Sequence, residues 1–429
     1  MNSTYFYKSA LAIAILGLAA CKPTIDVPAP TKGTADFTRY IALGNSLTAG
    51  FADGGLSLEG QQNSFPGMIA EQMKSVGGGS FSTPFFPTDK ANGTGYLKLT
   101  ALTNGVPTIV PETSNLAIRG QVNGVTLYTK YTGEINNFGV PNIKLIHARL
   151  PKYADFNGLY ERLLPGEFLT NPTTYLEFAT SKPWTFFSNW LGNNDILAYA
   201  TAGGAGAPPT DKGVFATEYN AVIDKLTSTG AKGVVGTIPG VTSTAFFNTV
   251  TLKTLLAAIN ATPAGANVKD IYIQPGVGAP RAATAGDLFT LTLSSAGVMG
   301  IPNNLGIPYG LDPRNPVATQ YVLDKAEVLT VNDYINSYNN TIKSIANAKG
   351  LAIMDGYTLL NEYAAGKPVN GIPVSGAFIQ GNLFSLDGIH LTPLGYAITA
   401  NAFISAINAK YGSNIPVVDI TRYRGVKLP

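Results

Sequence analysis

The chain has 429 residues, of which 45% are hydrophobic and 13% are charged. This composition is too apolar for a disordered protein, and it provides ample material for a large buried core. The formal net charge is only +3 and the Lys and Arg residues form no long runs, so nucleic acid is not expected as a partner.

The N-terminal segment is typical of a secretory signal that ends at a lipid attachment site. Lys8 precedes an apolar stretch over residues 10–18, which is too short to span a bilayer. The stretch runs into Leu-Ala-Ala and then Cys21, the single cysteine of the chain. This order resembles a bacterial lipobox, in which the cysteine is lipidated and becomes the first residue. We therefore predict a signal peptide over residues 1–20 and lipidation of Cys21. A soluble secreted protein with an unmodified cysteine is the alternative.

Residues 21–36 contain three prolines and little that could pack, so they are predicted to form an extended tether. The resemblance to bacterial lipoproteins also bears on the destination of the chain. Asp directly after the cysteine retains such proteins away from the outer membrane, whereas Lys22 stands at that position here. The expected location is therefore the bacterial cell envelope, lipid-anchored in the outer membrane. With one cysteine the fold has no internal disulfide and must rest on packing.

The globular body is expected over residues 37–412, followed by a C-terminal tail over residues 413–429. Its elements alternate between apolar runs, which predict buried strands, and segments of helical periodicity. Two insertions rich in Gly, Pro and Thr interrupt them and predict irregular or β structure. In chain order the elements are a strand over 39–43, a helix over 64–76, the first insertion over about 80–134, a strand over 185–191, a helix over 215–229, a strand over 233–238, the second insertion over 241–315, a helix over 333–348, a strand over 351–354 and a helix over 396–411.

This alternation predicts an α/β fold with three layers, a parallel sheet covered by helices on both faces. In such sheets ligands bind beyond the carboxyl ends of the strands. The segment Gly44-Asn45-Ser46-Leu47 follows the first predicted strand, so Ser46 is expected at that edge. The same segment is also a common way to begin a helix, with Asn or Ser as the cap.

The chain has only two histidines, His147 and His390. No H-E-x-x-H motif, paired cysteines, Walker loop or G-x-G-x-x-G motif is found, so neither a metal nor a cofactor is predicted. His147 has no acidic neighbour at useful spacing and is predicted to be structural. In Asp387-Gly388-Ile389-His390 the carboxylate could hold the imidazole Nδ1 proton and leave Nε2 as a base. Alone, this segment could equally pack against the helix that follows it.

Two further segments carry polar groups that could bind a developing negative charge. In Gly192-Asn193-Asn194-Asp195, the side-chain amide of Asn194 could donate to an oxyanion, although the segment alone reads as an Asn-rich turn. In Asn137-Phe138-Gly139-Val140-Pro141, Gly139 could expose its backbone N–H. Gly124 and Gly133 are alternatives to Gly139.

Taken together and in this order, the four segments resemble the conserved blocks of the SGNH hydrolases, also called the GDSL esterase/lipase superfamily. The resemblance implies the flavodoxin-like SGNH hydrolase fold, here with two large insertions. It implies that Ser46 is the nucleophile, His390 the base and Asp387 its orienting group. The backbone N–H groups of Ser46 and Gly139 and the side chain of Asn194 would form the oxyanion hole.

One position departs from the family pattern, because Asn45 stands where the first block has Asp. The residue is not catalytic in the family, and Asn can cap the same turn. The predicted function is a serine ester hydrolase that cleaves carboxylic esters through an acyl-enzyme, without metal or organic cofactor. An acyl lipid and an acetylated glycan are the competing substrates. The alternative is a non-catalytic surface lipoprotein that binds glycan or lipid on a hydrolase scaffold, in which Ser46 and His390 would lie apart.

Overall fold

The computed structural model describes residues 29–263 and 267–429. The predicted signal peptide, the lipidation site Cys21 and the first part of the predicted tether lie outside the described residues. Within the described part of the chain, no helix has the length and apolar character needed to cross a membrane.

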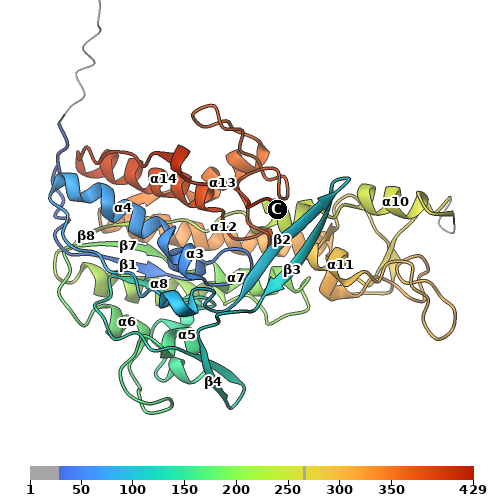
Figure 1. Cartoon of the computed structure of the whole chain (residues 1–429), viewed down its shortest axis with the longest axis horizontal. Helices are drawn as coiled ribbons and strands as arrows, with labels where there is room; N and C mark the ends of the chain where they lie inside the picture. The colour runs from blue at the N-terminus through green and yellow to red at the C-terminus, as the bar shows by residue number, and fades with distance from the viewer. Residues whose placement is uncertain (1–28, 264–266) are drawn as a thin grey trace, which may run out of the picture.

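The centre of the molecule is a five-stranded sheet in the order β13-β8-β7-β1-β6, with every neighbouring pair parallel (Figure 1). This arrangement confirms the predicted α/β class. Strand β1 lies between the central strand β7 and the edge strand β6, so that Ala42 stands opposite both Ser188 and Asn137. The strands are β1 (Tyr40–Gly44), β6 (Asn137–Gly139), β7 (Phe186–Trp190), β8 (Lys232–Gly236) and β13 (Ala352–Met354).

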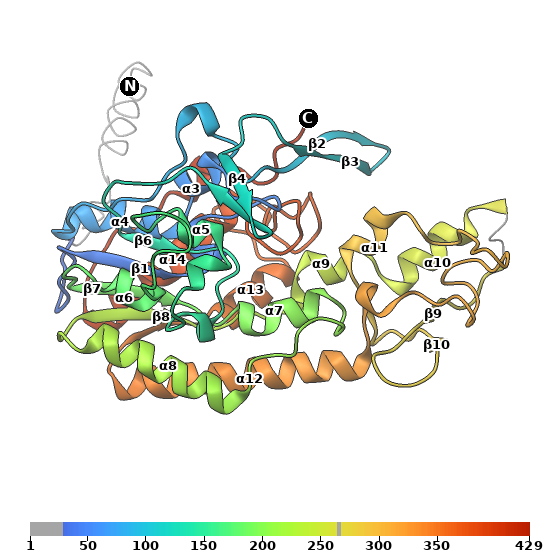
Figure 2. The ribbon, with the colours of Figure 1, turned by 90° about the horizontal axis from the view of Figure 1, so that it is seen from below.

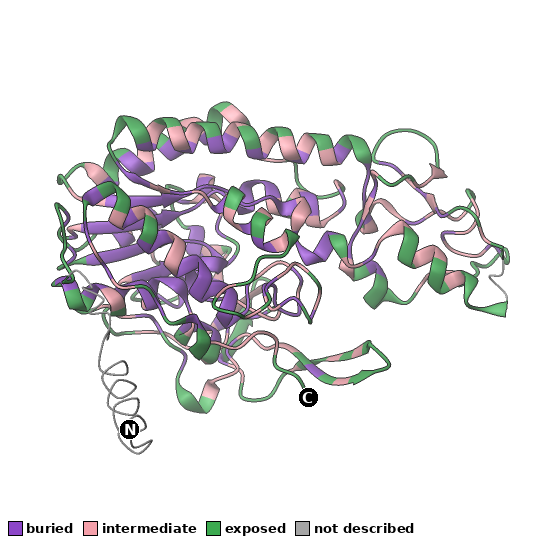
Figure 3. Ribbon diagram, turned by 90° about the horizontal axis from the view of Figure 1, so that it is seen from above, coloured by how far each residue is buried: buried purple, intermediate pink, exposed green. Residues whose placement is uncertain are grey.

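Strand β1 shows why helices cover both faces of the sheet. All of its residues are buried, and successive side chains in a strand point to opposite faces. Tyr40 and Ala42 therefore enter one core, which contains residues of the helices α4 and α14. Ile41 and Leu43 enter the other core, together with residues of α8 and α12. Figure 2 shows α8 and α12 side by side below the sheet, and Figure 3 shows the strands as the buried centre.

The predicted strands and helices of the body are present, with shifts at their ends. The largest shift is in α12, which begins at Lys325 rather than at residue 333. Asp324 caps this helix through the N–H groups of Ala326 and Glu327, and the Glu327 carboxylate returns to the Asp324 N–H. The helices are α4 (Phe65–Met73), α8 (Lys212–Thr227), α12 (Lys325–Ala348) and α14 (Pro393–Tyr411), with α7 (Asn194–Thr201) and α13 (Gly356–Ala365) added to the predicted set.

Several short helical segments join these elements. The α-helical ones are α2 (Ser46–Ala49), α3 (Leu58–Gln62), α5 (Gly158–Glu161) and α6 (Tyr175–Ala179). The 3₁₀ turns of the body are η1 (Lys74–Val76), η2 (Thr88–Lys90), η3 (Leu145–His147), η4 (Tyr153–Asp155) and η8 (Ile420–Arg422).

The first insertion forms two antiparallel hairpins, in agreement with the expected β character. They are β2 (Tyr96–Thr103) with β3 (Val106–Glu112), and β4 (Ile118–Val122) with β5 (Val125–Tyr128). Each hairpin turns at an Asn-Gly pair, residues 104–105 and 123–124, in which both residues have positive φ. This conformation is the one that tight hairpin turns require. The β2–β3 hairpin projects from the body (Figure 1).

The second insertion is a folded lobe rather than an irregular segment (Figure 2). It has a small core of its own, which includes Ile271, Ile273, Phe289 and Val317. Its helix α10 carries a capping box between Thr251 and Thr254 that the Gly- and Thr-rich composition had concealed. The elements are η5 (Val241–Ser243), α9 (Ala245–Asn248), α10 (Leu252–Asn260), β9 (Tyr272–Ile273), β10 (Arg281–Ala282), β11 (Leu288–Phe289) and α11 (Leu291–Ala296), closed by η7 (Thr319–Tyr321) and β12 (Val322–Leu323).

The ends of the body differ from the expected boundaries. Ile415, Val418 and Ile420 are buried in the same core as α14, so the expected C-terminal tail is packed onto the body. At the other end Ala35 and Phe37 are buried in that core, and the packed body therefore begins within the last residues of the expected tether.

Candidate active site

Ser46 lies beyond the carboxyl end of β1, an inner strand of the sheet. It is the first residue of α2, and the side chain of Asn45 caps this helix by accepting a hydrogen bond of 3.0 Å from the Leu47 N–H. The first N–H groups of a helix have no acceptor within the helix, so the Ser46 N–H is available to another group. The predicted nucleophile is therefore also the first residue of a helix. Asn45 caps this helix as an Asp would, but it carries no charge.

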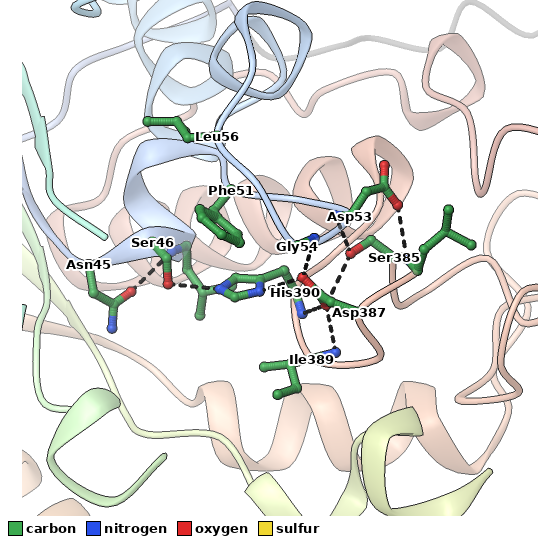
Figure 4. A network of polar contacts seen from close by, with 12 residues as sticks. Asn45, Ser46, Phe51, Asp53, Gly54, Leu56, Ser385, Asp387, Ile389 and His390 are labelled. Atoms are coloured by element: carbon green, nitrogen blue, oxygen red, sulfur yellow. Dashed lines mark hydrogen bonds and ion pairs between the residues drawn. The ribbon is translucent and has the colours of Figure 1, made fainter. Parts of the chain in front are cut away.

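The structure brings Ser46, His390 and Asp387 together, although Ser46 is far from the other two in sequence (Figure 4). The Nε2 atom of His390 lies 2.8 Å from Ser46 Oγ, and its Nδ1 atom lies 2.8 Å from Asp387 Oδ2. Both distances are within hydrogen-bond reach, as nucleophilic catalysis by a serine requires of its base and of the group that orients the base. The imidazole can thus take a proton from the hydroxyl.

The carboxylate of Asp387 is held by several donors. Its Oδ1 accepts from the N–H groups of Ile389 at 2.9 Å and His390 at 2.8 Å, and from the Ser385 hydroxyl at 3.2 Å. Its Oδ2 accepts from the Gly54 N–H at 2.9 Å. Burial alone would raise the pKa of Asp387, but His390 and these donors lower it below its ordinary value. Asp387 is therefore ionised at neutral pH and favours the tautomer in which Nε2 faces Ser46 unprotonated.

The loop that carries Asp387 and His390 depends on Gly388 between them. Its φ of 73° is a conformation that L side chains rarely adopt, and it lets the loop turn back so that Asp387 meets the imidazole. The Gly388 carbonyl accepts a hydrogen bond of 2.9 Å from the N–H of Phe246 in α9. On the other side the ring of Phe51 lies 4.5 Å from the imidazole, centre to centre. The second insertion thus supports the loop of residues 385–390, called the catalytic loop after the predicted roles of Asp387 and His390.

Asp53 supports the same loop and was not predicted from the sequence. Its N–H donates to the Ser385 hydroxyl at 2.8 Å, and its Oδ1 accepts from the Leu386 N–H at 2.9 Å. Burial raises the pKa of Asp53 to about 6. The pair Asp53-Gly54 is an ordinary turn signal. The sequence alone therefore indicates a turn here but not its contact with a loop more than three hundred residues away.

Asn194 lines the same cavity as Ser46 and His390. Its Nδ2 donates one hydrogen bond of 2.9 Å to the Ile143 carbonyl. A side-chain amide has two N–H groups, so a second donor remains for an oxygen in the cavity. This position fits the predicted oxyanion donor, and the contact with Ile143 fixes the plane of the amide.

Asp195, the residue after Asn194, fastens the start of α7 to its surroundings. Its buried carboxylate accepts from the Leu145 N–H at 2.6 Å and from the Thr210 hydroxyl at 2.7 Å. Burial raises the pKa of Asp195 to about 6, while these two donors act in the opposite direction. Asp195 therefore positions the first turn of α7 rather than reaching the cavity.

Gly139 is not placed as the oxyanion prediction required. Its N–H already donates to Asn137 Oδ1 at 3.0 Å. Gly139 lies at the end of β6 against α2, where an added Cβ would overlap the backbone of Thr48 and Ala49. The glycine is therefore explained by close packing. The turn after Gly139 supplies the Ile143 carbonyl, which accepts the hydrogen bond from the Asn194 side chain.

Gly124, Gly133 and His147 have structural contacts and do not line the cavity beside Ser46. Gly124 forms the turn of the β4–β5 hairpin, and Gly133 lies against the ring of Tyr131. His147 accepts a hydrogen bond of 3.2 Å from the Lys144 N–H through Nδ1 and stacks on Tyr153, with 4.6 Å between ring centres. Burial lowers the pKa of His147 to about 4. The described residues contain no group of three or more His, Cys, Asp or Glu side chains arranged to hold a metal.

The geometry agrees with a comparison to known protein families. The profile of the family described as GDSL-like Lipase/Acylhydrolase matches residues 40–403. The chain belongs to this family. The match begins at β1, which presents Ser46, and extends into α14, which follows His390. The GDSL-like family assignment therefore covers the whole site.

Solved structures of several hydrolases are similar to this GDSL-like protein at low sequence identity. The α/β hydrolase LAE5 from the metagenome of Lake Arreo, Spain, is 9% identical with a TM-score of 0.38, over 87% of this chain and 96% of that one. A variant of the acetyl xylan esterase Axe2 from Geobacillus stearothermophilus is 9% identical with a TM-score of 0.36, over 90% and 99%.

The lipase/acylhydrolase from Enterococcus faecalis is 11% identical with a TM-score of 0.34, over 89% of this chain and 100% of that one. Likenesses with TM-scores this low carry no argument about function. No curated protein matches the chain.

Proposed function

We propose that this protein is a serine hydrolase that cleaves carboxylic esters through an acyl-enzyme on Ser46. The observation that carries the proposal is the chain of contacts from Ser46 Oγ to His390 Nε2 and from His390 Nδ1 to Asp387. Membership of the GDSL-like lipase/acylhydrolase family supports it.

The proposed reaction uses only groups of the chain and water. Ser46 Oγ attacks the ester carbonyl carbon while His390 Nε2 takes the hydroxyl proton, and Asp387 stabilises the imidazolium. The carbonyl oxygen becomes negative and accepts from the Ser46 N–H and the Asn194 amide. When this intermediate collapses, the C–O bond to the alcohol breaks and the alcohol receives the proton from His390. Water then repeats both steps, which releases the acid and restores Ser46.

The alternative prediction, a non-catalytic binding scaffold, gains no support from the site. It required Ser46 and His390 to lie apart, whereas their reacting atoms are 2.8 Å from each other. A binding protein has no physical need for a base on the serine hydroxyl or for a carboxylate on the far side of that base.

Hydrolysis of p-nitrophenyl acetate by the purified protein and by its Ser46→Ala variant tests the proposal. We expect kcat/KM to fall by about 10⁴–10⁶, because the nucleophile and its base act as one unit. Ser75→Ala, at an exposed position, should retain full activity. A fluorophosphonate probe should label the wild type but not Ser46→Ala. Equal activity and labelling in the two proteins would assign the chemistry elsewhere.

The proposed reaction also defines the class of substrate. The substrate is an ester, with acyl lipids and acetylated glycans as the two classes considered.

We also propose that lipid on Cys21 anchors the protein in the outer membrane of a bacterial envelope, because the residues before and after Cys21 resemble a bacterial lipobox. Cys21→Ser should then move the protein from the detergent phase to the aqueous phase in Triton X-114 partition.

A further inference from the structure

A small apolar cavity opens directly beside Ser46 and has a free volume of about 40 Å³. Besides the segment Asn45–Leu47, four parts of the chain build its wall: α7 with the residue before it, the segment from the end of β8 to Thr244, α13 and the catalytic loop. The apolar residues of the wall are Leu47, Leu197, Ile238, Pro239, Val241, Leu360 and Ile389.

The cavity is more enclosed on one side than on the other. Ile238, Val241 and Leu360 are buried, whereas Leu197, Ile389 and His390 are half-buried. The enclosed end is therefore the one formed by the three buried residues, and the open side is the one that includes the imidazole.

The rear wall is held firmly in place. The side chain of Asn339 in α12 makes two hydrogen bonds to the backbone of Ile238, accepting from its N–H at 2.7 Å and donating to its carbonyl at 2.9 Å. A wall clamped in this way cannot easily retreat to admit a longer ligand.

The closed end suits the acyl half of an ester rather than the alcohol half. During turnover the acyl group stays bonded to Ser46 while the alcohol departs and a water molecule takes its place beside His390. A group enclosed by buried side chains cannot exchange in this way, whereas a group on the open side can. The alcohol is therefore expected to face solvent, where its size is not restricted by the cavity.

The volume then limits the acyl chain. A cavity needs about 10–15 Å³ to hold one water molecule, whose share of the liquid is about 30 Å³, so 40 Å³ admits about one to three heavy atoms beyond the carbonyl carbon. The enclosed end also disfavours a charged acyl group, because the side chains of Ile238, Val241 and Leu360 have no polar atom to replace its lost hydration. We propose that the substrates of this protein are acetyl or similarly short, uncharged acyl esters of larger alcohols. This inference rests on the proposed ester hydrolysis and narrows it.

A series of p-nitrophenyl esters from acetate through butyrate and octanoate to palmitate tests the inference, with the Ser46→Ala rate subtracted. We expect kcat/KM to fall at least about tenfold from acetate to butyrate, since even one methylene of misfit costs about 10–200-fold. Octanoate and palmitate should be lower still.

Two variants that deepen the cavity make the test specific to its wall. Leu360→Ala should raise the butyrate-to-acetate ratio of kcat/KM by about tenfold. Leu359→Ala removes the same atoms from the neighbouring position of α13, which does not line the cavity, and should leave the ratio unchanged. Val241→Ala provides the same readout should Leu360→Ala fail to fold.

The outcomes separate this inference from the proposed function. Activity that rises with chain length would overturn the short acyl group and leave the ester hydrolase standing. Equal ratios in Leu360→Ala, Val241→Ala and the wild type would show that this cavity does not hold the acyl group. A folded protein that hydrolyses no ester and takes up no fluorophosphonate would overturn the ester hydrolase, and this inference with it.

Discussion

At the scale of single residues, the amide of Asn194 has one N–H group in a structural hydrogen bond and a second one available for the proposed reaction. One is held by the Ile143 carbonyl, and the other remains for an oxygen in the cavity beside Ser46. We predict that Asn194→Ala lowers kcat by about 10²–10³ and changes KM little, because this donor strengthens its bond only as the oxyanion forms. Steady-state kinetics with p-nitrophenyl acetate measures both constants.

The matched control for this prediction is Asn408→Ala. Asn408 also donates through Nδ2 to a carbonyl, that of Ile415, but it lies in α14 and outside the cavity. Its loss should affect stability and leave kcat unchanged. A similar fall of kcat in both variants, or a rise of KM alone in Asn194→Ala, would argue against oxyanion stabilisation.

The residues with distinctive chemistry could be predicted from the sequence, whereas their supports could not. Ser46, Asp387 and His390 stand in short segments whose order resembles a known family. Asp53 holds the catalytic loop through one N–H and one carboxyl oxygen, and nothing in its neighbourhood in the sequence indicates that contact. Gly139 was misassigned because a glycine that allows close packing and a glycine that exposes its N–H look identical in a sequence.

At the scale of elements, the contact between β6 and α2 positions Ser46, the proposed nucleophile. Gly139 ends β6 directly against the backbone of Ala49, the last residue of the helix that begins at Ser46. We predict that Gly139→Ala destabilises the fold by about 1–3 kcal/mol through overpacking and displaces α2. Both the melting temperature and kcat with p-nitrophenyl acetate should fall.

Gly120→Ala is the comparison for this prediction, because an added Cβ there meets no atom within 4 Å. Its melting temperature and activity should match those of the wild type. If Gly139→Ala behaved like Gly120→Ala, the close approach between β6 and α2 would not matter for either property.

Elements with a strong pattern were the ones predicted correctly. The central strands are apolar because both of their faces are buried, and α8 places its buried residues at helical spacing. Strand β6 has only three residues, too few for a pattern. The helices of the second insertion were missed because their caps are threonines within a Thr-rich segment, where a capping residue does not stand out.

At the scale of the whole molecule, the relation between the insertions and the site depends on contacts that no local pattern records. The second insertion reaches the catalytic loop through the hydrogen bond from Phe246 to Gly388, and it supplies Val241 to the cavity wall. Fold class could be predicted from the alternation of elements alone. The contact between the second insertion and the catalytic loop could be identified only in the three-dimensional structure.

The balance of buried acids sets how stability changes with pH. Burial raises the pKa of Asp53 and of Asp195 to about 6, and that of Glu327 to about 7. Between pH 4 and 7 the folded state therefore keeps protons that the unfolded state has released, so stability falls as the pH rises. His147, with its pKa lowered to about 4, has the opposite effect over much of this range but is a single group. Asp387, whose pKa is lowered, reduces the stability only at a lower pH, where its carboxylate becomes protonated.

We therefore predict that the melting temperature is higher near pH 5 than near pH 7.5, and that Asp53→Asn reduces this difference. Asn can accept the Leu386 N–H and adopt the same positive φ, but it carries no charge to be buried. A shift of about two pKa units corresponds to at most about 3 kcal/mol, or about 3 °C for a chain of this length. Calorimetry at both pH values measures the difference in melting temperature.

The control is Asp89→Asn, at an exposed position, which should leave the difference between the two melting temperatures unchanged. A melting temperature that rises steadily from pH 5 to pH 7.5 would mean that the buried carboxyls ionise without cost and that the polar contacts around Asp53 compensate for its burial.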